Sequence, residues 1–110
     1  MSFLDSLPTR LKALEASVLP DLTLMVQNYA RDNGWPREAW TALKVDFQDA
    51  PDATGWRGYS VKYWRQPGEH DIVRESEFGF GAEQAPIPVG RKMATRLPQT
   101  AAYLINRRLS

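Results

Sequence analysis

Apolar residues in the first third of the chain recur every three or four positions, with charged residues between them. This spacing places the apolar residues on one face of an α-helix. The stripe comprises Leu4, Leu7, Leu11, Leu14, Val18, Leu22, Met25 and Tyr29. We expect it to face the core of its own chain, or in part to face another subunit.

Pro20 interrupts this helical pattern. A proline inside a helix removes one backbone hydrogen bond and clashes with the preceding turn, at a cost of about 3 kcal/mol. We therefore predict a kink, or two helices that meet near Leu19 and Pro20. Asn33-Gly34 provides a stop signal, and Pro36 follows shortly after it.

Apolar and polar residues alternate in two segments of the middle third, which predicts β-strands. The alternating sets are Leu43, Val45 and Phe47, and then Tyr59, Val61 and Tyr63. Residues 48–55, between the two sets, are acidic and rich in turn formers, and they predict a loop.

A third strand is predicted after a turn at residues 66–69. Pro67-Gly68 fills the two central positions, where glycine tolerates the positive φ of a type II turn. Strands over residues 56–65 and 70–78 then form a meander. In the second strand, alternation places Ile72, Arg74, Ser76 and Phe78 on one face and Val73, Glu75 and Glu77 on the other. Since neither face is apolar throughout, this strand is expected to be partly exposed or to contact another subunit.

The last third predicts two helical segments. The first opens near Pro88, because proline suits a first turn, and Val89, Met93 and Leu97 follow at intervals of four. Pro98 ends or kinks this helix, and the next segment places Ala101, Leu104, Ile105 and Arg108 near one face.

The order of these elements predicts an α+β fold. It has an N-terminal helix, an antiparallel β-sheet of about three to five strands and a C-terminal helix packed on one face. A chain of 110 residues without a long linker is expected to form a single domain over residues 1–110.

Composition removes several kinds of chemistry. The chain has no cysteine, which excludes disulfides, thiol catalysis and cysteine-bound zinc, and its one histidine, His70, excludes a multi-histidine metal site. We expect no cofactor and no metal. No apolar run approaches the roughly 18–20 residues of a membrane span, and MSFLDSLPTR lacks the pattern of a signal peptide. We expect a protein that is soluble and intracellular when made and that has no membrane partner.

Charge is unevenly distributed, although the net charge is only +1. Residues 86–110 contain no acidic residue, whereas residues 46–52 contain three aspartates and no basic residue. The basic residues of the first segment are Arg91, Lys92, Arg96, Arg107 and Arg108. They fit a solvated helix end, a head-to-tail contact between copies, or a surface for the phosphate backbone of a nucleic acid.

Four tryptophans are many for a chain of this length. They are Trp35, Trp40, Trp56 and Trp64. Tryptophans at these positions fit burial in the core, anchoring of a protein–protein interface, or stacking on the bases of a single strand.

Few residues offer catalytic chemistry. Glu75 and Glu77 share a face of the predicted strand, so a paired-carboxylate site is geometrically possible, although a hydrolase would need further ligands in a cleft. His70 follows the predicted turn, where a lone histidine is usually solvated. Gly79-Phe80-Gly81 lacks the third glycine and the helix of a nucleotide-binding loop, and indicates backbone flexibility at a strand end. We assign no catalytic residue.

The stretch EFGFGAEQAPIPVGRKMATR, residues 77–96, resembles a pattern of the small neck and tail-completion proteins of long-tailed bacteriophages, which are tail-terminator-like. In that family a strand ends in a Glu–aromatic–Gly triplet, and prolines lead into a C-terminal helix that has an Arg near its start. The matching residues are Glu77-Phe78-Gly79, Pro86, Pro88 and Arg91-Lys92. The loop Phe80-Gly81-Ala82-Glu83 departs from the shorter polar linkers usual there.

The resemblance implies a structural protein of the virion, without catalysis, that is made in the host cytoplasm and forms a homo-oligomeric ring at the head–tail connector. Its implied partners are copies of itself and the adjacent connector and tail-tube proteins. DNA passes through the lumen without sequence-specific binding. For the subunit interface we expect Glu75, Glu77, Phe78, Gly79, Phe80, Pro86, Pro88, Arg91, Lys92 and Arg96.

The sequence leaves two other functions open. The basic C-terminal helices suit a small nucleic-acid-binding module. A small toxin-like nuclease would have Glu75, Glu77 or His70 in its active site.

Overall fold

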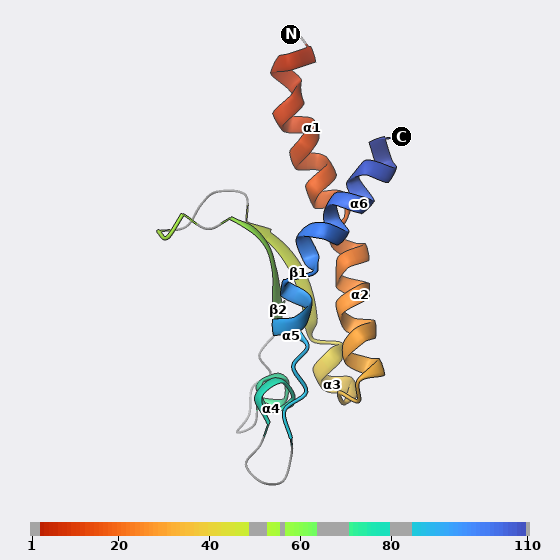
Figure 1. The fold of residues 1–110 in the computed structure, drawn as a ribbon, viewed down its shortest axis with the longest axis vertical. Coiled ribbons are helices and arrows are strands. Elements are labelled where there is room, and N and C mark those ends of the chain that lie inside the picture. Colours follow the sequence, from red (N-terminus) through yellow and green to blue (C-terminus); the bar gives the residue numbers. More distant parts are fainter. Residues whose placement is uncertain (1–2, 49–52, 56, 64–70, 80–84, 110) are drawn as a thin grey trace.

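The computed structural model describes residues 3–48, 53–55, 57–63, 71–79 and 85–109. Within these residues the chain is broadly α+β, with helices at both ends and a two-stranded antiparallel sheet between them (Figure 1). The elements in order are α1 (Phe3–Ser17), α2 (Leu19–Asp32), α3 (Arg37–Trp40), β1 (Leu43–Gln48), β2 (Gly58–Tyr63), α4 (Ile72–Phe78), α5 (Gly90–Ala94) and α6 (Leu97–Leu109).

Pro20 separates two helices, as predicted. Since α1 ends at Ser17 and α2 begins at Leu19, the proline lies in the first turn of α2, where its missing N–H costs no helical hydrogen bond. α2 ends before Gly34, whose φ of 95° is a conformation that residues with a Cβ rarely adopt. The predicted stop at Asn33-Gly34 is therefore confirmed.

The predicted stripe agrees with the structure in part: Val18 and Leu22 are buried, but Met25 and Tyr29 are only half-buried, because the buried face of α2 continues through Val26 and Ala30 instead. Leu22, Val26 and Ala30 of α2 are fully buried, whereas Leu11 of α1 is exposed. The remaining buried hydrophobic residues are Val18, Trp35, Ala39, Ala42, Leu43, Val45, Val73, Val89, Met93, Leu97 and Ala101. The core thus lies where α2, the sheet and the C-terminal helices meet.

β1 and β2 confirm the two alternating segments of the middle third. They pair in antiparallel register, with Val45 opposite Val61. Side chains of α2 bind the backbone of β1: the Thr23 hydroxyl accepts the N–H of Val45 at 3.0 Å, and the Gln27 amide donates to the carbonyl of Leu43 at 2.9 Å. These contacts attach β1 to α2. The described sheet has two strands, fewer than predicted, because residues 72–78, predicted to continue the meander beside β2, form a helix.

The largest correction concerns residues 72–78, which form α4 and not a strand. The Asp71 carboxylate caps this helix by accepting the backbone N–H of Arg74 at 3.1 Å. Val73, Ser76 and Glu77 are buried at the i, i+3, i+4 spacing of a helix face. Because two of these three residues are polar, hydropathy hides the helical period. The predicted strand faces of residues 70–78 are therefore wrong.

Several predicted features lie outside the described residues. They are the turn at residues 66–69, the strand ends at residues 56, 64, 65 and 70, and residues 49–52 of the acidic loop.

The C-terminal third contains the two predicted helices. α5 begins at Gly90, shortly after Pro88, and Pro98 lies in the first turn of α6. Met93 of α5 and Leu97 and Ala101 of α6 are buried at intervals of four. Both helices pack against β2, which fixes them beside the sheet.

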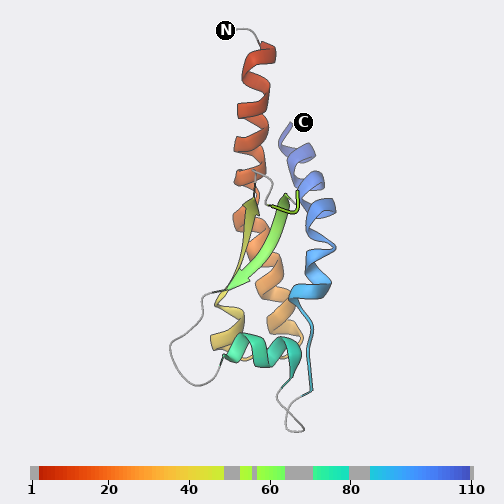
Figure 2. The same ribbon diagram turned by 90° about the vertical axis from the view of Figure 1, so that its left-hand side faces the viewer.

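The molecule is elongated, with principal extents of 60 × 32 × 22 Å. α1 and the end of α6 extend toward one end of the long axis, and α4 lies toward the other (Figures 1 and 2). None of the described helices combines the length and the apolar character that a membrane crossing requires.

Candidate interaction site

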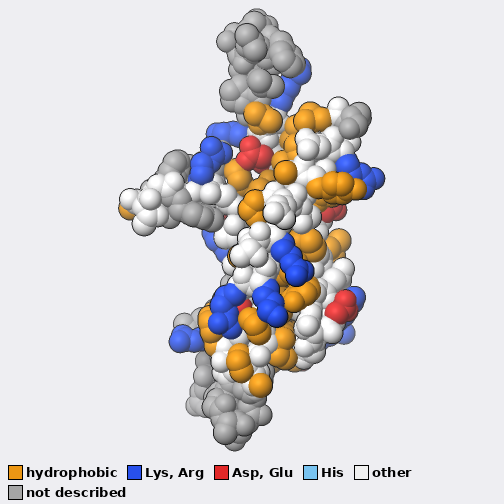
Figure 3. All heavy atoms as spheres, in the orientation of Figure 1, with side chains coloured by type: hydrophobic (Ala, Val, Ile, Leu, Met, Phe, Trp, Pro, Cys, Tyr) orange, Lys and Arg blue, Asp and Glu red, His pale blue; other side chains and the backbone are white. Residues whose placement is uncertain are grey.

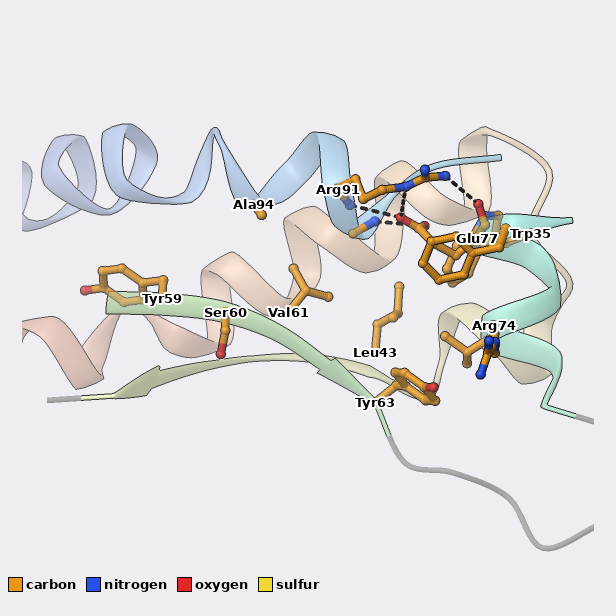
Figure 4. A pocket seen from close by; sticks show the side chains of 13 residues that line it. Trp35, Leu43, Tyr59, Ser60, Val61, Tyr63, Arg74, Glu77, Arg91 and Ala94 are labelled. Carbon is orange, nitrogen blue, oxygen red and sulfur yellow. Dashed lines mark hydrogen bonds and ion pairs between the residues drawn. The ribbon is translucent and has the colours of Figure 1, made fainter. Parts of the chain in front are cut away.

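Glu77 binds the start of α5 through its carboxylate. The carboxylate oxygens accept the backbone N–H groups of Val89 at 2.6 Å, Gly90 at 3.1 Å and Arg91 at 2.9 Å (Figure 4). Glu77 is only 7% exposed, so protein groups rather than bulk water satisfy its charge. The side chain therefore joins the end of α4 to the beginning of α5.

Arg91 ties the same two helices together from the other side. Its Nη2 donates to the carbonyl oxygen of Glu77 at 2.9 Å, and its Nε lies 3.4 Å from the carboxylate. Its guanidinium covers the ring of Phe78, with 4.7 Å between Cζ and the ring centroid. We term these three residues, Glu77, Phe78 and Arg91, the α4–α5 clamp.

Gly79 ends α4 in a conformation reserved for glycine. Its φ of 87° and ψ of 167° lie in a region that residues with a Cβ avoid. Its N–H donates to the carbonyl of Glu75 at 2.7 Å. The Glu–Phe–Gly triplet thus ends a helix here, whereas the sequence predicted the end of a strand.

Trp35 anchors the extended segment that precedes α5. Its indole N–H donates to the carbonyl of Ile87 at 2.9 Å, and the N–H of Ile87 donates to the carbonyl of Ser76 at 2.9 Å. Trp35 is buried and Trp40 is half-buried against the same core, which selects the core interpretation for both. Trp56 and Trp64 lie outside the described residues.

An open groove lies between β2, α4 and α5, with a cavity volume of about 360 Å³ (Figure 4). Its walls are mainly apolar and include Leu43, Tyr59, Val61, Tyr63, Val73 and Ala94. Two aromatic residues in its lining, Tyr63 and Phe78, are 40% and 59% exposed. This cavity, termed the β2–α5 groove, can therefore receive apolar side chains from outside the chain.

The polar groups of the groove are few. Arg74, Glu77 and Arg91 contribute the charged side chains of its lining. The Tyr59 hydroxyl donates to the carbonyl of Glu15 at 3.1 Å, which ties this wall to the base of α1. Burial, and to a lesser extent the nearby Glu15 carboxylate, raises the pKa of Tyr59, so this phenol is neutral at physiological pH.

The paired-carboxylate geometry that a hydrolase would need is absent from α4. Residues two apart on a helix are turned about 200° from each other, so Glu75 and Glu77 do not share a face. The described residues contain no group of three or more His, Asp and Glu residues that could hold a metal ion. His70 lies outside the described residues.

Lys and Arg side chains gather over α5 on the face drawn in Figure 3. Lys92, Arg96 and Arg107 are exposed. Arg96 lies over the ring of Tyr29, with 5.8 Å between Cζ and the ring centroid. Arg108 forms an ion pair with Asp21 at 2.7 Å, which ties the end of α6 to α2.

The residues predicted for a subunit interface occupy different environments. Glu77, Phe78 and Arg91 come together as the α4–α5 clamp, and Gly79 ends α4 next to it. Pro86, Lys92 and Arg96 are exposed, Glu75 and Pro88 are half-buried, and Phe80 lies outside the described residues. Their assignment to an interface stays a prediction.

Sequence reasoning missed the groove itself. The alternation of Tyr59, Val61 and Tyr63 predicts a strand, but it does not indicate a function for the face that they share. Their spacing of two, with two tyrosines flanking a valine, was the available signal. The opposite wall is formed by α4, and the misassignment of that helix concealed it.

The chain was compared with protein families, curated proteins and solved structures, and none of them matches it.

Proposed function

We propose that this chain is a structural, ring-forming component of the neck of a long-tailed bacteriophage, a tail-completion protein that joins head and tail. The observation that carries the proposal is an excess of surface on a polarised, elongated molecule. The motif resemblance is the reason to propose a virion protein. The extended surface is the reason to propose that copies associate with one another.

The surface is larger than that of a compact monomer. A globular protein of 12.5 kDa exposes about 6,200 Å², and this chain exposes 7601 Å². Its radius of gyration is 16.5 Å, against about 13 Å for a compact domain of this length. The excess of about 1,400 Å² follows from the elongated shape, which leaves more surface for contacts with other copies than a compact domain has. Two patches per subunit are what a closed ring requires.

The α4–α5 clamp gives the matched stretch a structural role, although its triplet ends a helix here and not the strand of the family pattern. Among the residues that match the family pattern, Glu77, Phe78 and Arg91 contact one another and fix the path from α4 into α5, and Gly79 ends α4. A physical role for each of them explains why such a pattern would recur. In this proposal the clamp shapes the subunit, and the surfaces beside it make the contacts.

The distribution of charge also suits this function. Cations over α5 and acidic residues elsewhere favour head-to-tail contact between copies. A net charge of +1 keeps attraction to DNA weak, which suits a lumen through which DNA must slide.

Native mass spectrometry and negative-stain electron microscopy over a range of protein concentrations test the proposal. The expected result is a closed oligomer of defined stoichiometry. Particles of the phage that encodes the chain should contain it at the neck, and a deletion should leave heads and tails unjoined. A chain that stays monomeric and is absent from particles would overturn the proposal.

A nucleic-acid-binding module is a second candidate, favoured by exposed Lys92, Arg96 and Arg107 in a region without acidic residues. Fluorescence anisotropy with a labelled single strand tests it. Neutralisation of about three phosphates predicts a slope of about −2 in log K against log salt concentration. The ring proposal expects no binding near physiological salt.

A further inference from the structure

We propose that the N-terminal arm of one copy docks in the β2–α5 groove of the next. The arm is defined as residues 3–14 of α1, the part that precedes Glu15. This inference rests on the proposed ring and names the contact that builds it. Each subunit then gives its arm to one neighbour and receives the arm of another.

The arm is a helix, and none of its described side chains belongs to the buried core. Leu11 is 43% exposed and Leu14 is half-buried. The two leucines are three residues apart, so they lie on one face of the helix. A helix of about 15 residues is marginal in water without tertiary packing. The arm therefore needs a surface that covers this face.

The groove offers such a surface and is out of reach of its own arm. It is apolar and concave, and Tyr63 and Phe78 remain exposed in its lining. Its far wall, α4, lies toward the opposite end of the long axis from α1 (Figure 1). The connection between Tyr59 and the base of the arm at Glu15 holds the arm pointing away from the groove. An arm that enters the groove therefore comes from another copy.

The arm is long enough to span the groove. Twelve helical residues extend about 18 Å. The β2 wall of the groove runs from Tyr59 to Tyr63, about 13 Å of strand. An amphipathic helix that places its apolar side chains in a hydrophobic groove is an established mode of recognition.

The contact is heterologous because the arm and the groove are different surfaces. A two-fold dimer of paired arms would cover the leucines but leave Tyr63 and Phe78 exposed. Docking of arm into groove covers both surfaces at once and repeats from copy to copy, so it can close into a ring.

The absence of cysteine from the chain allows a direct test. Leu11→Cys and Ala94→Cys are prepared as separate proteins, mixed and oxidised, and the products are separated under non-reducing conditions. Ala94 is an exposed residue of the groove wall. We expect the mixed disulfide dimer to dominate over either homodimer. Glu38→Cys, on exposed α3, replaces Ala94→Cys as the matched control and should not cross-link to Leu11→Cys.

A second pair of variants keeps the test independent of disulfide geometry. Leu11→Asp is expected to shift the midpoint of oligomer formation to about tenfold higher protein concentration or more, because a carboxylate cannot enter the groove without cost. Leu24→Asp, at a 56% exposed leucine of α2, is the control and should leave the midpoint unchanged. Both leucines are exposed, so the monomer fold should survive, as circular dichroism will verify.

The outcomes separate this inference from the proposed ring. Preferential homodimers of Leu11→Cys would overturn it in favour of paired arms. Oligomers that form normally in Leu11→Asp, without mixed cross-links, would overturn the docking contact and leave the ring intact. A wild-type chain that is monomeric at every concentration would overturn both.

Discussion

The carboxylate of Glu77 and the backbone N–H of Arg91 lie 2.9 Å apart, although 14 residues separate them in the sequence. In the opposite direction, the Arg91 side chain donates a hydrogen bond to the backbone carbonyl of Glu77 at 2.9 Å. Each residue thus binds the backbone of the other, which fixes the angle between α4 and α5 from both sides. The β2–α5 groove lies between these helices and the sheet, so its shape depends on this pair.

Glu77→Gln should destabilise the fold. In wild type both carboxylate oxygens accept hydrogen bonds from backbone N–H groups. In the variant one of these oxygens is replaced by an NH₂ group, which is a donor and cannot accept them. A buried donor left without its charged acceptor costs about 1–3 kcal/mol. Urea denaturation followed by tryptophan fluorescence will measure the loss in the free energy of unfolding. Glu38→Gln, at an exposed residue of α3, is the control, with an expected change within about 0.5 kcal/mol. Equal free energies of unfolding for the two variants would show that the Glu77 carboxylate does not stabilise the fold.

Gly79→Ala should also destabilise the protein, for a conformational reason. Alanine at a φ of 87° and ψ of 167° is strained by about 1–3 kcal/mol. The matched substitution is Gly90→Ala, where the new Cβ would lie 3.5 Å from the nearest atom, an oxygen of Glu77, an ordinary contact. That variant should stay within about 0.5 kcal/mol of wild type. Thermal unfolding of both proteins gives the comparison, and a Gly79 variant as stable as the Gly90 variant would contradict the strain.

Trp35→Phe should weaken the attachment of the segment before α5. The ring still fills most of the site, but the carbonyl of Ile87 loses the indole N–H that lies 2.9 Å away. The expected cost is about 1–3 kcal/mol. Trp40→Phe, at a half-buried position of α3, is the control for the loss of indole volume. Hydrogen exchange provides a local measure, because faster exchange at Ile87 in the first variant alone would mark the detached segment.

The sequence predicts an element well where one hydropathy period dominates it. Leu22, Val26 and Ala30 recur every four residues, and α2 forms as expected. In α4 the buried positions include Ser76 and Glu77, so burial and hydropathy disagree and the helix resembles a strand. The signal that favours the helix is the cap at Asp71, a local hydrogen bond that a count of apolar residues does not register.

The site is harder to predict than the elements around it. The sequence singles out residues 77–96 only by their resemblance to a family pattern, and most partners of the Glu77 carboxylate are backbone N–H groups, which have no signature in the sequence. The burial of a carboxylate at position 77 therefore could not be inferred. The groove depends on how α4 and α5 are placed relative to β2, with α5 packed on β2 and α4 packed on α3, and the order of these elements along the chain does not specify that placement.

Asp46 provides a pH-dependent contact on the sheet. Its carboxylate accepts a hydrogen bond from Lys62 at 3.1 Å and another from the N–H of Phe47 at 3.0 Å, and these hold the pKa of Asp46 below its ordinary value of 3.8. A depressed pKa stabilises the folded state above the ordinary value, and this contribution is lost as the pH falls through the pKa of the folded state. The effect on stability is small because the pair is exposed.

An NMR titration that follows each carboxyl resonance separately will measure the pKa of Asp46. In wild type, Asp46 should titrate below pH 3.8. In Lys62→Met it should titrate closer to its ordinary value, because the largest cause of the depression is removed. Lys92→Met is the matched control and should leave the titration of Asp46 where it is in wild type. A titration that Lys62→Met leaves unchanged would assign the depression to the backbone of Phe47 instead.

The last prediction concerns the cations over α5, and it separates their role in assembly from their role in folding. Arg91 is unsuitable for charge reversal because it holds Glu77, so its loss would disturb the monomer. Lys92 and Arg96 are exposed, and a Lys92→Glu, Arg96→Glu double variant should fold while its oligomer weakens. The same oligomer in wild type should weaken as salt rises, because exposed charges attract less at shorter Debye lengths. Arg37→Glu, at an exposed residue of α3, reverses one charge on a different element and should assemble normally. Unimpaired assembly of the double variant at low salt would place the subunit contact away from this basic face, leaving the arm and the groove to hold the copies together without electrostatic help.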